Sequence, residues 1–317
     1  MAPEFQTHSL QLPASAAGLR LDQALAAALP QYSRARLQRW IRTGAVRVQG
    51  RTALARARVH GGEQIVVEAQ FEPDLAVAGE ALALDIVYQD SALLVLNKPA
   101  GLVVHPGAGN RAHTLQNALL AHDPALARVP RAGLVHRLDK DTSVLLIVAR
   151  TPETHTRLVA MLAERVIGRE YLALVNGVPT GGARIEQPIG RHRSQRTRMA
   201  VRRDGREAVT HYRIEQRFRS HTLLRVRLET GRTHQIRVHL AHVGLPVIGD
   251  PVYGGRRRLS AGASPELIAL LQGLHRQALH AERLVLAHPH SGQPLNFQAP
   301  LPADLAALLA ALRTQAR

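Results

Sequence analysis

GLVHRLDKDTSVLLIVAR, residues 133–150, combines a strong strand signal with a cluster of charged side chains. Residues 143–150 are mostly apolar and partly β-branched, which is typical of a buried strand. Before this run, Asp139 and Asp141 follow a His–Arg pair. A carboxylate near several cations is held in its charged form, in which it can act as a nucleophile or a base. The same residues also suit a structural turn, so the local sequence leaves both interpretations open.

On both sides of this segment, short apolar runs are separated by Gly and Pro. We expect most of these runs to be strands, at residues 84–99, 134–139, 144–150, 170–177, 208–218 and 221–231. Helical patterns intervene at residues 113–122, 152–164, 232–243, 264–276 and 302–314. Because strands dominate without a strict alternation of strand and helix, the sequence predicts an α+β fold, with a largely antiparallel mixed sheet and flanking helices.

The N-terminal part of the chain has the pattern of a separate small unit. The 317 residues are too many for one small core and suggest a small domain beside a large one. We expect a flexible lead at residues 1–17, a small domain at 18–75, a linker at 76–83 and a large domain at 84–317.

The small unit is predicted to contain a cationic helix. Leu21, Leu25 and Leu29 recur at helical spacing, and a second helix is expected at residues 34–43, with strands at 45–48 and 62–69. The second helix carries the basic residues Arg34, Arg36, Arg39 and Arg42. An Arg-rich helix followed by a hairpin can grip phosphates, whereas an isolated charge run is more often a solvated helix face.

Positive charge is the strongest signal in the composition. Lys+Arg is 41 and Asp+Glu is 24, so 41 − 24 gives a net charge of +17. A cation of this size binds polyanions through counterion release. Only Lys98 and Lys140 are lysines, and Arg presents a planar fork that grips phosphate and stacks on bases. A genome that favours Arg codons would explain Arg over Lys, but not the net excess.

The composition also excludes several classes of protein. The chain has no cysteine, which excludes disulfides, thiolate catalysis and Cys-based zinc or iron–sulfur sites. Residues 1–12 lack the cationic start and apolar core of a secretory signal, and no stretch approaches the length of a membrane-spanning helix. We therefore expect a cytoplasmic protein without membrane contact.

DKDT at residues 139–142 matches in part the D-x-D-x-T pattern of haloacid dehalogenase-type phosphatases. Those enzymes need an uninterrupted apolar strand before the first Asp, a later Lys and a late acidic pair for magnesium. Here a His–Arg pair interrupts the strand, and no Lys follows Lys140. The sequence therefore argues against a phosphatase, which would release phosphate in a magnesium-dependent reaction.

HRLDKDTS at residues 136–143 resembles the catalytic motif of the RluA-type pseudouridine synthases. Three further stretches agree with that family in order and spacing: LNKPAGLVVHPG at 96–107, REYLALVNG at 169–177 and LETGRTHQIRVHLAHVGLPVIGDPVYGG at 228–255. The small unit in front resembles an S4 RNA-binding domain. Several long motifs in register are far more specific than one short pattern, and the likeness covers nearly the whole chain.

The resemblance implies a role for each matching residue. Asp139 matches the aspartate that attacks the target nucleotide, and Tyr171 matches a tyrosine that packs on the flipped uracil. Arg237 matches the basic residue that pairs with the catalytic carboxylate, and Arg137 matches an arginine that fills the place of the flipped base. The family usually has Gly where this chain has Val144, which indicates an extended backbone at that position.

Pseudouridylation breaks the N-glycosidic bond of a uridine, turns the uracil and rejoins it through carbon. This isomerisation needs no redox change, phosphate energy or metal, so we expect no cofactor. The base must leave its stack before a side chain can reach it. Asp139 would then add to C6 of uracil, attack C1′ of the ribose or remove the C2′ proton, and the sequence leaves these routes open.

The resemblance also implies the partner, which is 23S ribosomal RNA or a large-subunit precursor. We expect a monomer that contacts RNA through the following residues: His136, Arg137, Arg34, Arg36, Arg39, Arg191, Arg193, Arg196 and Arg198. His234, His239 and His242 could suggest zinc, but no H-E-x-x-H pattern or nearby acid accompanies them, and we expect no metal site. The alternative function is a non-catalytic RNA-binding factor for ribosome assembly.

Overall fold

The computed structural model describes residues 4–30, 32, 34–71, 77–106, 110, 112–136, 139–195, 197–255 and 262–315. The chain divides into two compact units, Met1–Ala76 and Val77–Arg317, which are described separately below. Within the described residues, no helix is both long enough and apolar enough to cross a membrane.

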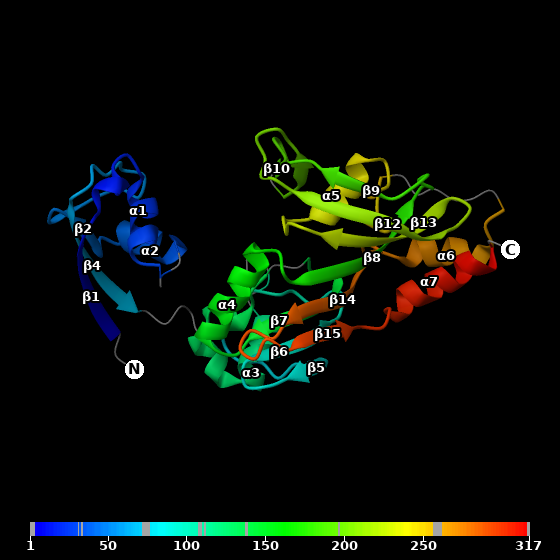
Figure 1. The fold of residues 1–317 in the computed structure, drawn as a ribbon, viewed down its shortest axis with the longest axis horizontal. Coiled ribbons are helices and arrows are strands. Elements are labelled where there is room, and N and C mark those ends of the chain that lie inside the picture. Colours follow the sequence, from blue (N-terminus) through cyan, green and yellow to red (C-terminus); the bar gives the residue numbers. More distant parts are fainter. Residues whose placement is uncertain are drawn as a thin grey trace. The chain divides into compact units, whose positions relative to one another are not determined.

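The small unit packs two short helices on a four-stranded sheet (Figure 1). Its elements are β1 (Glu4–Gln11), α1 (Leu21–Ala28), α2 (Arg34–Arg42), β2 (Val46–Val48), β3 (Arg51–Thr52) and β4 (Gln64–Phe71), in the sheet order β1-β4-β2-β3. Leu21, Leu25, Leu37 and Trp40 are buried between the helices and the sheet. The two expected helices and the strand that follows them are therefore present.

The expectation of a flexible lead at residues 1–17 is wrong. Strand β1 pairs antiparallel with β4 over its whole length, from Glu4 opposite Phe71 to Gln11 opposite Gln64. Its polar residues gave no strand signal in the sequence. The backbone hydrogen bonds to β4 nevertheless order this segment, because a strand at the edge of a sheet needs only one partner.

The larger unit is built around one continuous sheet. In the residues that the structure describes, this sheet has nine strands. It contains β5 (Ile86–Gln89), β6 (Leu93–Lys98), β7 (Ser143–Ala149), β8 (Gly168–Asn176), β9 (Ala183–Glu186), β12 (Val209–Arg217), β13 (His221–Leu228), β14 (Leu279–Ala287) and β15 (Pro294–Gln298). The order is β5-β6-β7-β14-β8-β13-β12-β9, with β15 beside β14. Strands β7 and β14 run parallel, and the other pairs are antiparallel. The predicted α+β class with a largely antiparallel sheet is confirmed.

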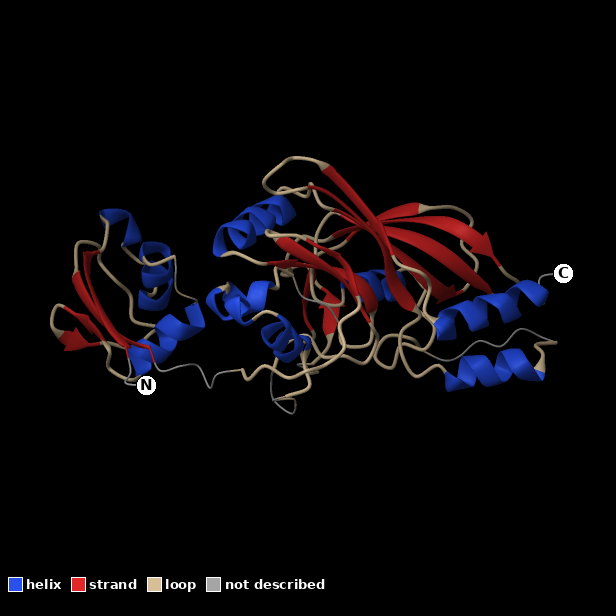
Figure 2. Cartoon of the chain, turned by 90° about the horizontal axis from the view of Figure 1, so that it is seen from below, coloured by secondary structure: helices blue, strands red, loops and turns tan. Residues whose placement is uncertain are grey.

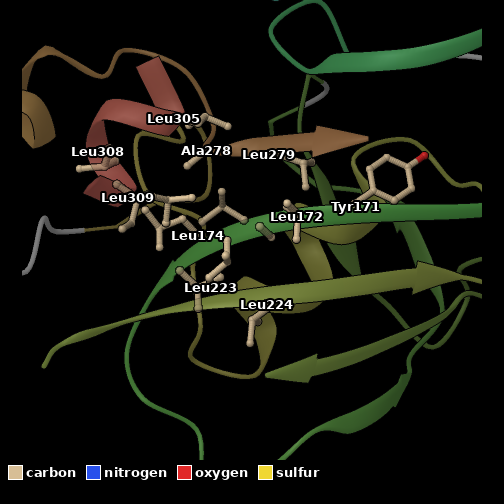
Figure 3. Close-up of a cluster of buried hydrophobic side chains, with 14 of the residues drawn as sticks. Tyr171, Leu172, Leu174, Leu223, Leu224, Ala278, Leu279, Leu305, Leu308 and Leu309 are labelled. Carbon is tan, nitrogen blue, oxygen red and sulfur yellow. The ribbon is translucent and has the colours of Figure 1, made fainter. Parts of the chain in front are cut away.

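Helices cover this sheet in two groups (Figure 2). The helices are α3 (Leu115–His122), α4 (Pro152–Ala163), α5 (Gln235–His242), α6 (Pro265–Gly273) and α7 (Ala303–Thr314). Residues of α3 and α4 pack with β6 and β7 in one core. Residues of α5, α6 and α7 pack with β8 and β13 in a second core, part of which Figure 3 shows. Tyr171 lies at one end of the labelled cluster in Figure 3, with its hydroxyl pointing away from the leucines.

A separate hairpin consists of β10 (Ile189–Arg191) and β11 (Met199–Val201). It was not expected from the sequence, because each strand has only three residues. Ile189 of this hairpin packs in a small buried cluster with Val238 of α5 and Tyr253. The hairpin is therefore fixed against the helix that carries Arg237.

Residues 134–139 do not form the expected strand. Leu134 makes an isolated bridge to Val148, and the other described residues of this segment lie in a loop. The chain enters the loop through left-handed backbone at Arg131, Ala132 and Gly133, with φ values of 55°, 51° and 82°. This turn takes the segment out of the sheet, so Asp139 stands in the loop directly before β7. Val144 is extended in β7 and buried, as its replacement of Gly indicated.

We predict that Gly133→Ala destabilises the larger unit. An added Cβ would overlap the carbonyl oxygen of Ala149, and φ at this position is in the left-handed region. The two effects should lower the free energy of unfolding by at least about 2 kcal/mol. Thermal unfolding followed by circular dichroism measures the loss. Gly181→Ala is the control, because Gly181 has open space around it and no left-handed φ. Equal stability of the two variants would contradict the prediction.

Candidate active site

Three elements of the larger unit meet around Asp139. The carboxylate stands on the loop that leads into β7, beside the start of α5 and the first half of β8. Ser143, at the start of β7, hydrogen-bonds through its hydroxyl to Nδ1 of His280 on the parallel strand β14, at 3.0 Å. The side chain of Asp139 is 21% exposed, so it is accessible from solvent but largely enclosed.

Asp139 and Arg237 form a direct ion pair. Nη1 of Arg237 donates a hydrogen bond of 2.9 Å to Oδ2 of Asp139. The Arg237 side chain is only 5% exposed, so water screens this pair weakly. The guanidinium therefore stabilises the negative charge of Asp139 and fixes the position of one carboxylate oxygen. The structure therefore contains the ion pair between Arg237 and Asp139 that the resemblance implied.

A second carboxylate, Asp250, holds Arg237 from the other side. Nε and Nη2 of Arg237 donate to the two oxygens of Asp250, at 2.6 and 2.8 Å, in the paired geometry that suits a guanidinium. Asp250 is fully buried and also accepts the backbone amides of Val252 and Tyr253. Burial raises the pKa of Asp250, but the hydrogen bonds and charge of Arg237 outweigh it, so that the pKa lies below its ordinary value. Asp250 is therefore a permanent anion that sets the direction of Arg237.

His234 approaches the other oxygen of Asp139. Its Nε2 lies 3.7 Å from Oδ1 of Asp139, and its Nδ1 lies 2.8 Å from the Tyr253 hydroxyl. His234 precedes α5 and Arg237 lies within the first turn of that helix, so both side chains reach the same carboxylate. The start of α5 thus supplies one contact to each oxygen of Asp139.

Tyr171 forms a wall of a narrow recess that ends at Asp139. The recess, of about 90 Å³, is lined among others by Asp139, Arg169, Tyr171, His234 and Arg237. Burial raises the pKa of Tyr171 above its ordinary value of 10, and the charge of Asp139 adds to the rise. Tyr171 is therefore a neutral aromatic wall, which suits a flat uncharged ring. The structure brings together all three residues that the sequence singled out for chemistry.

A wider groove of about 880 Å³ shares Asp139 and Arg169 with this recess. Its walls include His136 and, from the β10–β11 hairpin, Arg191. Arg191 and Arg193 are exposed and Arg198 is half-buried, so these predicted RNA-binding residues lie on or beside the hairpin. The groove combines cationic walls with a polar floor, as a nucleic-acid backbone requires.

Several predicted RNA contacts are not placed by the structure. Arg137 and Arg196 lie outside the described residues, as do the side chains of Arg34 and Arg36 in α2. Arg39 is exposed on α2, in the small unit. These residues stay predictions.

Lys98 anchors the loop that carries Asp139. Its Nζ donates to the carbonyl oxygens of Pro99, Leu102 and Lys140, at 2.8, 3.1 and 2.9 Å. Burial lowers the pKa of Lys98 to about 8, although the charges of Asp141 and Asp139 raise it. All three ammonium protons are used by the backbone, so Lys98 supports the loop without reaching into the recess.

Sequence reasoning missed four residues of this site. Arg169 lines both hollows, and within the described residues its Nε has no hydrogen-bond partner. Asp250 stands in a quoted motif without a role, and His234 was considered only as a zinc ligand. Tyr253 was quoted within a motif without a role. Their role depends on contacts between distant segments, although each stands in a motif that the resemblance had already marked.

The three histidines considered for zinc have different surroundings. His239 is buried and bonds to the Thr210 hydroxyl and the Gln187 carbonyl, both at 2.9 Å. His242 is exposed, and His234 contacts Tyr253 and Asp139. The described residues contain no cluster of three or more His, Asp or Glu side chains placed to bind a metal.

Comparison with known proteins gives a consistent result. Residues 92–242 match the family model described as RNA pseudouridylate synthase, and residues 19–65 match the S4 domain. The ribosomal large subunit pseudouridine synthase D of Xanthomonas campestris pv. campestris is 53% identical over 95% of this chain and 91% of its own length. The protein of the same name from Pseudomonas aeruginosa is 52% identical over 96% and 95%.

Solved structures of human proteins share the fold of the larger unit. Human RNA Pseudouridylate Synthase Domain Containing 4 is 27% identical, with a TM-score of 0.58 over 72% of this chain and 92% of its own. Human RNA Pseudouridylate Synthase Domain Containing 1 is 26% identical, with a TM-score of 0.56 over 74% and 89%.

We predict that Asp250→Asn lowers the free energy of unfolding by about 3 kcal/mol at neutral pH, because the buried Arg237 guanidinium loses its charged partner inside the core and keeps only Asp139. The folded-state pKa of Asp250 is depressed, so its contribution is present above the unfolded-state pKa of about 4 and is lost as the pH falls through the folded-state value. The difference between wild type and variant should therefore shrink in acid. Urea unfolding at about pH 7 and about pH 3 measures both values.

Asp304→Asn is the matched control for this substitution. Arg276 donates to both oxygens of Asp304, at 2.6 and 2.7 Å, but the Asp304 side chain is 44% exposed. The loss should stay within about 1 kcal/mol, because water screens an ion pair whose carboxylate is this exposed. If both variants lost the same free energy of unfolding, burial would not strengthen the Arg237–Asp250 ion pair, and the prediction would be contradicted.

Proposed function

The chain belongs to the RNA pseudouridylate synthase family, and from this premise we propose that it converts uridines of 23S ribosomal RNA to pseudouridine with Asp139 as the catalytic carboxylate. It is an RNA pseudouridine synthase with an S4 domain in front of the catalytic unit. The observation that carries the assignment of Asp139 is its ion pair with Arg237 at the end of a recess walled by Tyr171.

The geometry of the recess suits the chemistry of a uridine. The reaction needs a negative group next to the ribose and the uracil while the N-glycosidic bond breaks and the base turns. Arg237 pairs with Asp139 and holds it in place, and preorganised charges of this kind cost no rearrangement during the reaction. Attack at C6, attack at C1′ and removal of the C2′ proton all begin from this charged carboxylate.

Tyr171 and Arg169 suit the recognition of an extruded base. A uridine that leaves its stack loses a few kcal/mol of stacking and pairing energy, part of which contacts in the enzyme recover. The Tyr171 ring offers an apolar face, and the Arg169 guanidinium, which also lines the recess, offers donors for a uracil carbonyl. Arg137 is proposed to fill the gap that the base leaves.

The wider groove is proposed to hold the RNA backbone on either side of the target uridine. Arg191, Arg193, Arg196 and Arg198 would contact phosphates there, together with His136. In the small unit, Arg34, Arg36 and Arg39 of α2 would contact a second part of the same RNA. A ribosomal substrate places the enzyme in the cytoplasm.

Asp139→Asn should abolish pseudouridine formation on a 23S rRNA transcript, because the amide keeps the shape of the side chain without its charge. The assay follows isotope-labelled uridine, and the rate should fall by at least about 1,000-fold. Asp141→Asn is the control, because Asp141 stands in the same loop but does not line the recess.

Two outcomes would contradict this assignment. One is a wild-type protein that forms no pseudouridine on ribosomal transcripts, and the other is an Asp139 variant as active as wild type. A strain that lacks the gene separates catalysis from a binding role in ribosome assembly. Rescue of its ribosome defect by the Asp139 variant would show that binding alone suffices.

Replacing Arg191 and Arg193 together by Ala should weaken RNA binding uniformly across sequences. Each phosphate contact releases counterions, so the slope of log affinity against log salt should become shallower by about 1 to 2. Filter binding or fluorescence anisotropy at several salt concentrations measures the slope. The control replaces Arg213, which is exposed on the sheet, and Arg283, which is half-buried on it; neither lines the groove. If the salt slope changed equally in both double variants, the effect would come from net charge alone, and the proposed contacts of Arg191 and Arg193 with phosphates would be contradicted.

A further inference from the structure

Building on the proposed function, we propose that Tyr253 is a positioning residue, which couples the β10–β11 hairpin to the catalytic carboxylate through His234. Tyr253 touches neither the recess nor Asp139 in the structure. It contacts three groups that do reach the site or the groove: Met199 of the hairpin, His234 and Arg237.

The backbone of Tyr253 is fixed by the same carboxylate that holds Arg237. Oδ1 of Asp250 accepts the amides of Val252 and Tyr253, at 2.8 and 3.0 Å. The two oxygens of Asp250 also accept the Arg237 guanidinium. The turn from Asp250 to Tyr253 is therefore one rigid piece that supports both Arg237 and the Tyr253 ring.

The Tyr253 hydroxyl joins the hairpin to His234. The amide of Met199 donates to this hydroxyl at 2.9 Å, and Nδ1 of His234 lies 2.8 Å from it. In the proposed arrangement the hydroxyl oxygen accepts from Met199 and the hydroxyl donates its own proton to Nδ1. A neutral His234 then carries its proton on Nε2, the nitrogen that faces Oδ1 of Asp139 at 3.7 Å.

One oxygen of Asp139 is thus hydrogen-bonded by Arg237, and the other faces His234. Arg237 holds Oδ2 and is supported by Asp250, whereas His234 faces Oδ1 and is supported by Tyr253. A carboxylate contacted on one oxygen alone can rotate about its bond to the chain. A hydrogen bond on Oδ2 and an imidazole N–H that faces Oδ1 at 3.7 Å together restrict the plane of the carboxylate, and hence the direction from which it meets the nucleotide.

The hairpin end of this connection lies where RNA is proposed to bind. The guanidinium carbon of Arg198 stands 5.4 Å from the centre of the Tyr253 ring, and that of Arg237 stands 5.0 Å from it. Met199 and Arg191 of the hairpin line the wide groove. A phosphate backbone in the groove would set the position of the hairpin, and through the Met199 amide it would set Tyr253 and His234.

The backbone of His234 supports a functional reason for its position. Its φ is 57°, in the left-handed region, and strained non-Gly residues gather at functional sites. Asn adopts this conformation readily, which makes His234→Asn a substitution that keeps the backbone.

The test begins with Tyr253→Phe, which removes the hydroxyl and keeps the ring between Arg198 and Arg237. We expect kcat to fall by about tenfold, the effect of one lost orienting hydrogen bond, while KM for the RNA changes less than about twofold. Tyr88→Phe is the matched control. It removes a hydroxyl that donates 2.7 Å to Asp90 on the far side of the sheet, and kcat should stay at the wild-type value.

A double-mutant cycle then tests the route through His234. His234→Asn alone should lower kcat to a similar extent without raising KM. If the hydroxyl acts through His234, adding Tyr253→Phe to His234→Asn should lower kcat no further. A purely structural role of Tyr253 would instead lower the unfolding temperature and leave the two effects independent.

The outcomes separate this inference from the proposed function. Wild-type activity that Asp139→Asn abolishes supports the proposed function, whatever happens at Tyr253. With that activity present, a wild-type kcat in Tyr253→Phe, or fold-losses that multiply in the double variant, would overturn the coupling. A loss confined to KM would overturn it too, because it would place Tyr253 in binding alone.

Discussion

The buried guanidinium of Arg237, held between two carboxylates, is the interaction on which the site depends. A guanidinium that is 5% exposed is stable only with charged partners in good geometry. Asp250 supplies two hydrogen bonds inside the core, and Asp139 supplies one at the surface of the recess. The same cation therefore joins the packing of the larger unit to the position of the proposed catalytic carboxylate.

The sheet explains how segments so far apart in sequence meet at this cation. Asp139 and Arg237 are 98 residues apart, and Asp250 belongs to a turn beyond α5. The parallel pair β7–β14 and the antiparallel pair β14–β8 set the Asp139 loop beside Tyr171. Lys98 then ties the loop to β6 through three backbone carbonyls. A rigid scaffold thus holds a charged loop that could not keep its shape alone.

Much of the fold was readable from the sequence, because local patterns and long motifs carry it. The α+β class, the major helices and the pairing of Asp139 with Arg237 followed from periodicity or from resemblance. The sequence did not show that residues 4–11 form strand β1, because a polar strand at the edge of a sheet depends on pairing with its partner, here β4. The strand expected at residues 134–139 does not form, although its apolar residues favour one. The left-handed backbone at Gly133 turns this segment out of the sheet. His234, Asp250 and Tyr253 gain their roles from contacts across the fold, which spacing alone cannot give.

Trp40, described above as part of the small unit's core, is the single tryptophan of the chain. It lies edge-on to Tyr32, with ring centres 4.9 Å apart. Indole emission therefore comes from the small unit alone, and the larger unit contributes only tyrosine. The protein thus carries a built-in optical reporter for one of its two halves. Engagement of that half by a nucleic acid can be followed spectroscopically without attaching a dye.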